Sequence, residues 1–273
     1  MENITITGNT YRTSDYSIFK RLEGNRAVLQ IRVNRILKSI NTYGYIYNPI
    51  VVNEKYEVID GQGRLEACIH LNKPIDFVIS PGAGLKECVA LNASGTLWTI
   101  PDYIDSYCEL GIPDYIRLKC LLRDFPDIGS RTILSLAAGR SGCPNDDIKA
   151  GKFHLSAEQA DCVRGDLVFV SRCMPFLNKI PGGPRYYPYA LAFAKHCGVP
   201  MDRLLLVVSR NMLDSVNDTR VALDKLSELY NWKLQPDKRI YLRTLYDQTN
   251  SRNVGWYNSN WIPPITQRKE SDE

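Results

Sequence analysis

The spacing of apolar residues predicts a compact α+β unit in the first part of the chain. Between Leu29 and Tyr43, apolar residues recur at helical spacing while Arg32, Arg35 and Lys38 fall on the opposite face, which indicates an amphipathic helix. Short apolar runs bounded by turn residues are typical of β-strands, and they cover residues 48–52, 56–59 and 75–79. Residues 65–72 and 85–92 favour two further helices. We therefore expect an α+β unit over roughly residues 12–95.

The rest of the chain has the apolar spacing of helices, with little strand signal. The helical segments are residues 100–110, 112–125, 131–138, 156–173, 187–197, 202–213 and 216–230. Glycine and proline clusters, such as Pro181-Gly-Gly-Pro184, separate them. The predicted fold class is α+β, with a first domain at residues 1–98, a mostly helical domain at residues 99–235 and a C-terminal extension at residues 236–273.

Composition limits the function without identifying it. The 273 residues carry a net charge of +4, so the chain lacks the strong basic excess that is typical of nucleic-acid-binding domains. Apolar runs stay well below the ~18 residues of a membrane span, and the first residues lack a secretory leader. The eight cysteines include no Cys-x-x-Cys pair and have apolar neighbours, as core residues do. We expect a cytoplasmic protein without membrane contact or a metal site, in which most cysteines are buried and unpaired.

The segment Val58-Ile-Asp-Gly-Gln-Gly-Arg-Leu-Glu-Ala67 carries the clearest chemistry. A strand followed by a glycine-rich turn and a helix presents unpaired backbone N–H groups at the helix start, where they attract phosphate. Gly61 and Gly63 would let a phosphate approach the backbone because they have no Cβ, and Arg64 adds a two-pronged cation. Asp60 could cap the helix or help to place a metal or a ribose. A plain strand–helix turn with a paired arginine is the alternative.

The wider order of motifs resembles the N-terminal domain of the ParB/sulfiredoxin family, over about 80 residues. Asn25-Arg26 precedes the amphipathic helix, Pro49-Ile-Val-Val52 begins the hairpin, and Cys88-Val-Ala-Leu-Asn92 looks like the family's second box. The turn segment is most similar to that of the ParB-like proteins of phages and mobile elements. The resemblance implies a nucleotide-phosphate site that takes CTP, as in ParB proteins, or ATP, as in sulfiredoxin, together with Mg²⁺.

The resemblance assigns phosphate or nucleotide contacts to a set of residues in this chain. They are Asn25, Arg26, Gly61, Gln62, Gly63, Arg64 and Asn92. Two positions depart from the family's Gly-Glu-Arg-Arg motif: Gln62 replaces the glutamate, which puts nucleotide hydrolysis in doubt, and Gly63 replaces the first arginine. Sulfiredoxin's catalytic cysteine would also fall at Gln62, so the resemblance nearly excludes that chemistry.

Two other classes of function stay open beside a nucleotide-dependent, DNA-associated ParB-like protein. An enzyme on the same fold, either a nuclease or an ATP-dependent kinase, would use Asp60 and Glu66 as metal ligands or acid–base groups. A non-catalytic interaction protein could keep the fold after losing the ligand, as the changes at Gln62 and Gly63 permit. The three histidines are scattered along the chain, so no metal centre or catalytic triad is indicated. A homodimer is a candidate assembly.

Contacts with DNA would come from the helical part of the chain. Residues 131–156 are similar to the helix-turn-helix region that follows the nucleotide domain in ParB proteins, and Arg131, Arg140, Lys149 and Lys152 are candidates for phosphate contacts. Because Cys143-Pro-Asn145 interrupts the expected reading helix, an ordinary helical bundle is an equal alternative. Near the C-terminus, aromatic residues are interleaved with basic ones, and they either stack bases or anchor the C-terminal extension through buried rings.

Overall fold

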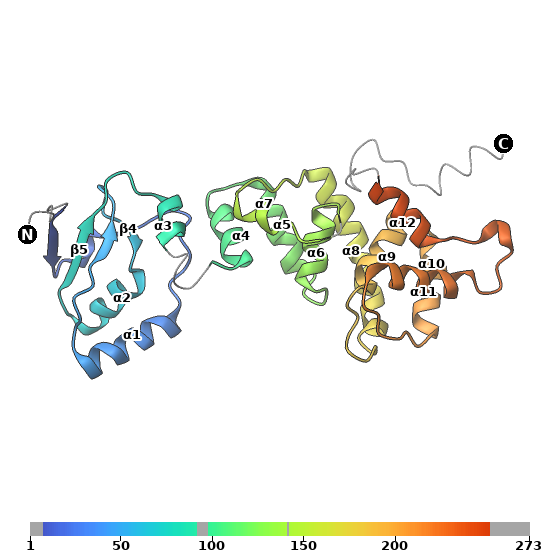
Figure 1. Ribbon diagram of the computed structural model, residues 1–273, viewed down its shortest axis with the longest axis horizontal. Coiled ribbons are helices and arrows are strands. Elements are labelled where there is room, and N and C mark those ends of the chain that lie inside the picture. The colour runs from blue at the N-terminus through green and yellow to red at the C-terminus, as the bar shows by residue number, and fades with distance from the viewer. Residues whose placement is uncertain (1–7, 92–97, 141, 252–273) are drawn as a thin grey trace, which may run out of the picture. The chain divides into compact units, whose positions relative to one another are not determined.

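The computed structural model describes residues 8–91, 98–140 and 142–251, and it divides the chain into two compact units (Figure 1). The first unit comprises residues 1–112 and the second residues 113–273. The first contains strands and helices, whereas the described residues of the second are helical apart from their connecting loops. The α+β fold class and the mostly helical second part are therefore confirmed.

In the described part of the first unit, five strands form a sheet in the order β1-β5-β3-β4-β2. The strands are β1 (Thr10–Thr13), β2 (Lys20–Arg21), β3 (Ile50–Val52), β4 (Glu57–Asp60) and β5 (Ile75–Ile79). The central strand β3 pairs with β4 in antiparallel and with β5 in parallel orientation. The sequence predicts these three strands but misses β1 and β2, because those short edge strands are almost entirely exposed and show no apolar alternation.

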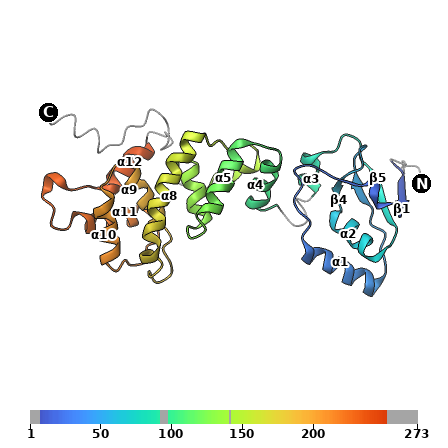
Figure 2. The ribbon, with the colours of Figure 1, turned by 180° about the vertical axis from the view of Figure 1, so that it is seen from behind.

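Helices cover both faces of this sheet. They are α1 (Gln30–Tyr43), α2 (Gln62–Leu71), α3 (Leu85–Leu91) and α4 (Ile100–Glu109). Neighbouring strand residues point to opposite faces, so Val58 of β4 packs into a core with Cys68 of α2, while Ile59 packs into a second core with Cys88 of α3. Helix α1 packs mainly against α2, and Figure 2 shows the pair from the other side.

Helix α4 belongs to the first unit, although the pattern of the sequence groups it with the helical part. Trp98, just before α4, is buried in the second core of the sheet, and its ring lies 5.2 Å from that of Tyr103. The guanidinium of Arg21, on β2, forms an ion pair with Glu109, with a second nitrogen–oxygen distance of 2.8 Å. These contacts tie both ends of α4 to the first unit.

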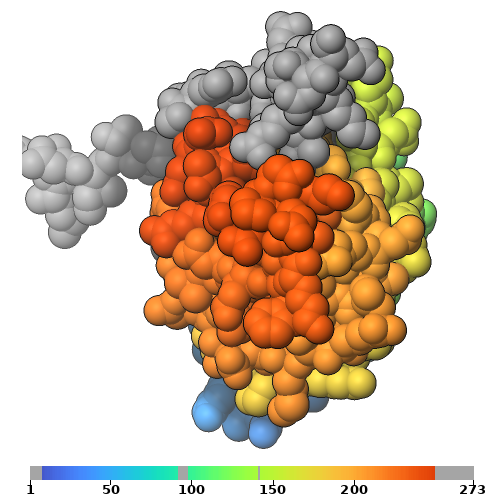
Figure 3. All heavy atoms as spheres, turned by 90° about the vertical axis from the view of Figure 1, so that its right-hand side faces the viewer, coloured from blue at the N-terminus to red at the C-terminus, as the bar shows by residue number. Residues whose placement is uncertain are grey.

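The second unit is built around a helix that is apolar on all sides. Its helices are α5 (Pro113–Asp124), α6 (Ser130–Ala137), α7 (Asn145–Lys149), α8 (Ala157–Leu177), α9 (Tyr187–His196), α10 (Met201–Arg210), α11 (Thr219–Asn231) and α12 (Leu242–Ser251). Residues 187–194 of α9 are all buried, as expected for a helix without a polar face. Helices α6, α8 and α11 pack against it. In Figure 3, α10 and α11 (orange) lie beside the segment that ends in α12 (red).

Cysteine burial follows the sequence prediction only in part. Cys68, Cys88, Cys173 and Cys197 are buried, but Cys162 is exposed and the remaining three are intermediate. None of the eight sulfurs, all of which lie in the described ranges, is in a disulfide. Burial raises the pKa of the Cys88 thiol to about 11, so it stays protonated at neutral pH.

No described helix is both long and apolar enough to cross a membrane.

Candidate phosphate-binding site

The turn between β4 and α2 requires a glycine at its first position. Strand β4 ends at Asp60, Gly61 adopts the left-handed conformation (φ 94°), and α2 begins at Gln62. A Cβ on Gly61 would lie 2.5 Å from Cγ2 of Ile50, which is fully buried in the sheet. Gly61 also provides no side-chain cap for the first turn of α2. The predicted strand–glycine–helix turn is therefore present. The backbone N–H groups in the first turn of α2 donate no hydrogen bond to a capping side chain.

Gly63 has a packing role in addition to the one that the sequence suggests. A Cβ at this position would lie 3.3 Å from Cδ1 of Ile36, on α1. The glycine therefore lets the start of α2 pack closely against α1. It also lines the cavity described below, so packing and access to the backbone both depend on its small size.

Arg64 forms an ion pair within the turn itself. Its Nη2 lies 2.6 Å from Oδ2 of Asp60, and its Nη1 donates to the carbonyl of Asn48 at 3.3 Å. The side chains are 21% and 35% exposed, so solvent screens this pair only in part. Asp60 therefore does not cap α2; its Oδ2 is engaged by Arg64. Part of the charge of Arg64 is offset by this ion pair.

Asn25 and Arg26, to which the family resemblance assigns phosphate contacts, form another wall of the same cavity. The side chain of Asn25 is buried, and its amide donates to the carbonyl of Val58 at 3.4 Å, which holds the loop against β4. The guanidinium of Arg26 is half-buried. Burial lowers the pKa of Arg26, and the neighbouring charge of Arg32 lowers that pKa further. Two cations therefore stand close together here.

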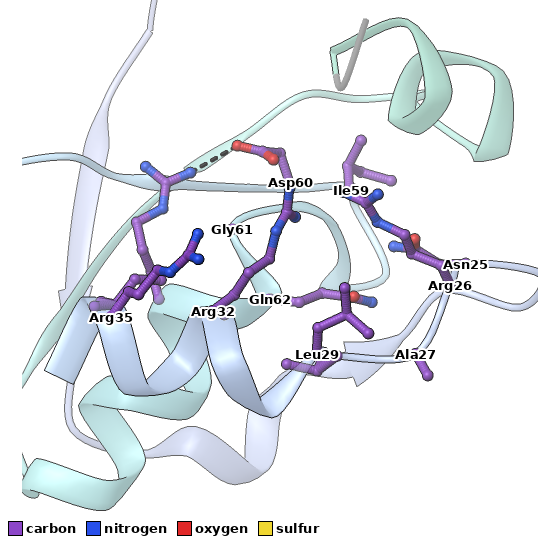
Figure 4. A pocket seen from close by; sticks show the side chains of 14 residues that line it. Asn25, Arg26, Ala27, Leu29, Arg32, Arg35, Ile59, Asp60, Gly61 and Gln62 are labelled. Atoms are coloured by element: carbon purple, nitrogen blue, oxygen red, sulfur yellow. Dashed lines mark hydrogen bonds and ion pairs between the residues drawn. The ribbon is translucent and has the colours of Figure 1, made fainter. Parts of the chain in front are cut away.

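Helix α1 contributes two arginines that the sequence analysis places only on a solvated face. The side chains of Arg32 and Arg35 rise from α1 toward Asp60 and Gly61 (Figure 4). Within the described residues, neither forms a side-chain hydrogen bond or an ion pair. Their spacing of three residues, on the polar face of a helix preceded by Asn25-Arg26, is the signal that could have identified them.

These walls enclose a cavity of about 330 Å³ between α1 and the β4–α2 turn (Figure 4). Among the described residues that line it, the charged ones are Arg26, Arg32, Arg35, Arg64 and Asp60. Four permanent cations and the start of a helix thus face one carboxylate. Such an arrangement is repulsive when empty and attracts anions, especially ones with several charges. Guanidinium groups also match the geometry of phosphate oxygens.

Other predicted site residues are less central. Gln62 lines the cavity. Glu66 does not; its side chain is 44% exposed and lies 3.8 Å from His70, as expected for a solvated helix residue. Asn92 lies outside the described residues. Among those described, no three side chains of the types that bind metals come together.

The candidates for DNA contact are spread over short elements of the second unit. Arg131 is in the first turn of α6, Arg140 pairs with Asp147 at 2.7 Å, and Lys149 ends α7. Lys152 follows it and is exposed. Helix α7 has five residues, about 7.5 Å of length, which is little for a helix that reads a DNA groove.

The C-terminal aromatic residues divide into two groups. Tyr246 is buried and its ring lies 5.2 Å from that of Phe193 on α9, so it anchors α12 as predicted. Trp232 and Tyr241 are 70% and 57% exposed and have no such anchoring role. Trp256, Tyr257 and Trp261 lie outside the described residues.

Comparison with known proteins adds little to this geometry. No family model matches the chain, and no curated protein was found to match it. A solved structure of the C2221 form of a Pnob8-like ParB-N domain is similar, with 14% sequence identity over 76% of this chain and 82% of that chain, and a TM-score of 0.29. A TM-score of 0.29 is too low to support a conclusion about fold or function. The resemblance to ParB proteins therefore depends on the sequence motifs.

Proposed function

We propose that the first unit binds a nucleotide through its phosphates, in the cavity between α1 and the β4–α2 turn. The observation that carries the proposal is the group of four arginines that faces one carboxylate at a helix start. Arg32 and Arg35 have no acidic partner among the described residues, so a bound polyphosphate would relieve their mutual repulsion. The ParB-like motifs favour CTP or ATP as the ligand.

The wider role that we propose is that of a nucleotide-dependent, DNA-associated ParB-like protein of a phage or mobile element. This part follows from the motif order around residues 25–92. Arg32 and Arg35 favour it over an interaction protein that has lost its ligand, because such a protein has no need of two cavity-lining cations that lack an acidic partner among the described residues. A cytoplasmic location and a homodimer are part of the same proposal.

The cavity fits phosphate better than it fits a protein-held Mg²⁺ ion. Mg²⁺ in nucleotide sites is usually held by one or two carboxylates together with phosphate oxygens. Asp60 is the only carboxylate among the described lining residues, and Arg64 holds it at 2.6 Å. Any Mg²⁺ would therefore be coordinated mainly by the nucleotide and water. Because Glu66 does not line the cavity and Asp60 is paired with Arg64, a nuclease or kinase that uses these two carboxylates is a weaker hypothesis than nucleotide binding.

The substitution Asp60→Asn tests the proposal. It removes the one negative charge of the cavity and keeps the shape of the side chain, so affinity for Mg²⁺-free nucleoside triphosphate should rise roughly fivefold, or about 1 kcal/mol for a partly screened charge. The free energy of unfolding should fall by up to ~1 kcal/mol, because the pair with Arg64 is lost. Calorimetric titration in the presence of EDTA measures the first effect and urea unfolding the second.

The matched control is Asp237→Asn, which removes the same charge from an exposed position in the second unit. It should leave the affinity unchanged. An unchanged affinity in Asp60→Asn would mean that the anion binds away from this cavity, and the proposal would fail.

A further inference from the structure

The second unit contains a cavity of its own, of about 500 Å³, at the starts of three helices. Arg131 and Thr132 belong to the first turn of α6, Arg185 and Tyr186 precede α9, and Thr219 is the first residue of α11. Segments at least thirty residues apart in the sequence thus meet around one space. Its volume is in the range of about 300–1,000 Å³ that is usual for small-molecule sites.

The charges that face this cavity are all positive. Arg131 and Arg185 line it, and none of its described lining residues is acidic. Elsewhere in this unit arginines often pair with carboxylates, as Arg164 does with Asp124 and Arg220 with Asp247, both at 2.8 Å. Arg131 and Arg185 form no ion pair or side-chain hydrogen bond within the described residues. Both residues are exposed, so their cations are solvated and open to an external anion.

Backbone and hydroxyl groups complete the set of donors. Gly129, which precedes α6, makes no side-chain cap to that helix, so N–H groups in its first turn are left for other partners. At the start of α9 the N–H of Tyr187 donates to the carbonyl of Pro184 and the next residue is Pro188, so that helix start adds little. Thr132, Ser135 and Thr219 place hydroxyl groups in the lining. Two guanidiniums, three hydroxyls and the start of α6 thus place hydrogen-bond donors around one cavity that has no acidic residue in its described lining. That combination matches the oxygens of a phosphate group.

We propose that this cavity is a second phosphate site, which binds a small phosphorylated molecule between Arg131 and Arg185. The sequence assigns Arg131 to DNA backbone contact. The structure instead places it with Arg185 at a solvent-open cavity of about 500 Å³, a volume that suits a small ligand and is far too small to hold a duplex. This site belongs to the second unit and is separate from the cavity that contains Arg32 and Arg35.

Hydrogen–deuterium exchange of the full chain with pyrophosphate as the probe tests the proposal. Ionic strength is held constant with chloride. Exchange should slow at least threefold in residues 129–135 and 185–190. Arg131→Gln and Arg185→Gln should each abolish this protection in both segments, because the two arginines share one ligand. The exchange of the remaining helices shows that each variant is folded.

Two matched variants separate this site from the first one. Arg172→Gln removes an exposed arginine of α8 that does not line the cavity and should leave the protection intact. Arg32→Gln/Arg35→Gln should affect only protection in the first unit, so either proposal can fail without the other. Protection that is absent at millimolar pyrophosphate, that survives both Arg131→Gln and Arg185→Gln, or that appears only with a DNA duplex would overturn the small-molecule site.

Discussion

Gly61→Ala is expected to destabilise the first unit by about 3 kcal/mol. The left-handed conformation of Gly61 (φ 94°) costs an alanine roughly 1–2 kcal/mol. In addition, the new Cβ would lie 2.5 Å from Cγ2 and 2.9 Å from Cβ of Ile50, and overpacking of this kind typically costs about 1–3 kcal/mol. Ile50 is fully buried in the central strand and has little room to move. Thermal unfolding should show the transition of the first unit lowered by on the order of 15 °C.

Gly82→Ala separates the conformational cost of an alanine at positive φ from the cost of overpacking against Ile50. Gly82 also has a positive φ, 75°, but a Cβ there would meet nothing within 4 Å. This control should therefore show only the conformational cost, about 1–2 kcal/mol. Equal destabilisation by the two substitutions would contradict the close approach of the β4–α2 turn to Ile50, on which the position of the helix start depends.

Arg32→Gln/Arg35→Gln is expected to lower the affinity for a nucleoside triphosphate at least a hundredfold. Each charged hydrogen bond contributes about 1.5–3 kcal/mol, and both side chains point toward the β4–α2 turn (Figure 4). Neither arginine has an ion pair in the described part of the chain, so the free energy of unfolding should change by less than about 0.5 kcal/mol. Calorimetric titration and urea unfolding of the same variant measure the two quantities.

Lys38→Gln is the matched control for this pair. Lys38 is exposed on the same helix and does not line the cavity, so its loss should change affinity by less than twofold. If loss of the arginine pair and loss of the lysine lowered the affinity equally, the cations would act only through the net charge of the protein. No defined binding site would then be needed to explain the affinity. A large loss of stability without a loss of affinity would make the arginines structural.

Much of the first unit can be predicted from sequence because its central elements have strong periodicity. The helix over 30–43 has an amphipathic pattern, and the strands over 50–52, 57–60 and 75–79 are apolar runs between turns. The missed elements lack such signals. Strands β1 and β2 are exposed edges, α7 is a five-residue helix that begins after Pro144, and α12 falls in a polar stretch that was assigned to the C-terminal extension.

The candidate site could be predicted only along one segment. Asp60 to Arg64 are contiguous, so their strand–turn–helix geometry follows from local sequence rules. Arg32 and Arg35 enter the site because α1 packs against α2, a contact that Gly63 and Ile36 permit. Periodicity identifies the polar face of α1 but not what that face points toward. The pairing of Arg64 with Asp60 is likewise a matter of side-chain geometry.

The most direct test of the central claim is a calorimetric titration of the full chain with the mono-, di- and triphosphate of one nucleoside. Because four arginines face the cavity, affinity should rise severalfold with each added phosphate, and it should fall as salt screens the charges. Cytidine and adenosine series should both be measured. An affinity that is the same for the nucleoside and its triphosphate, or no binding of any triphosphate at millimolar concentration, would contradict the account.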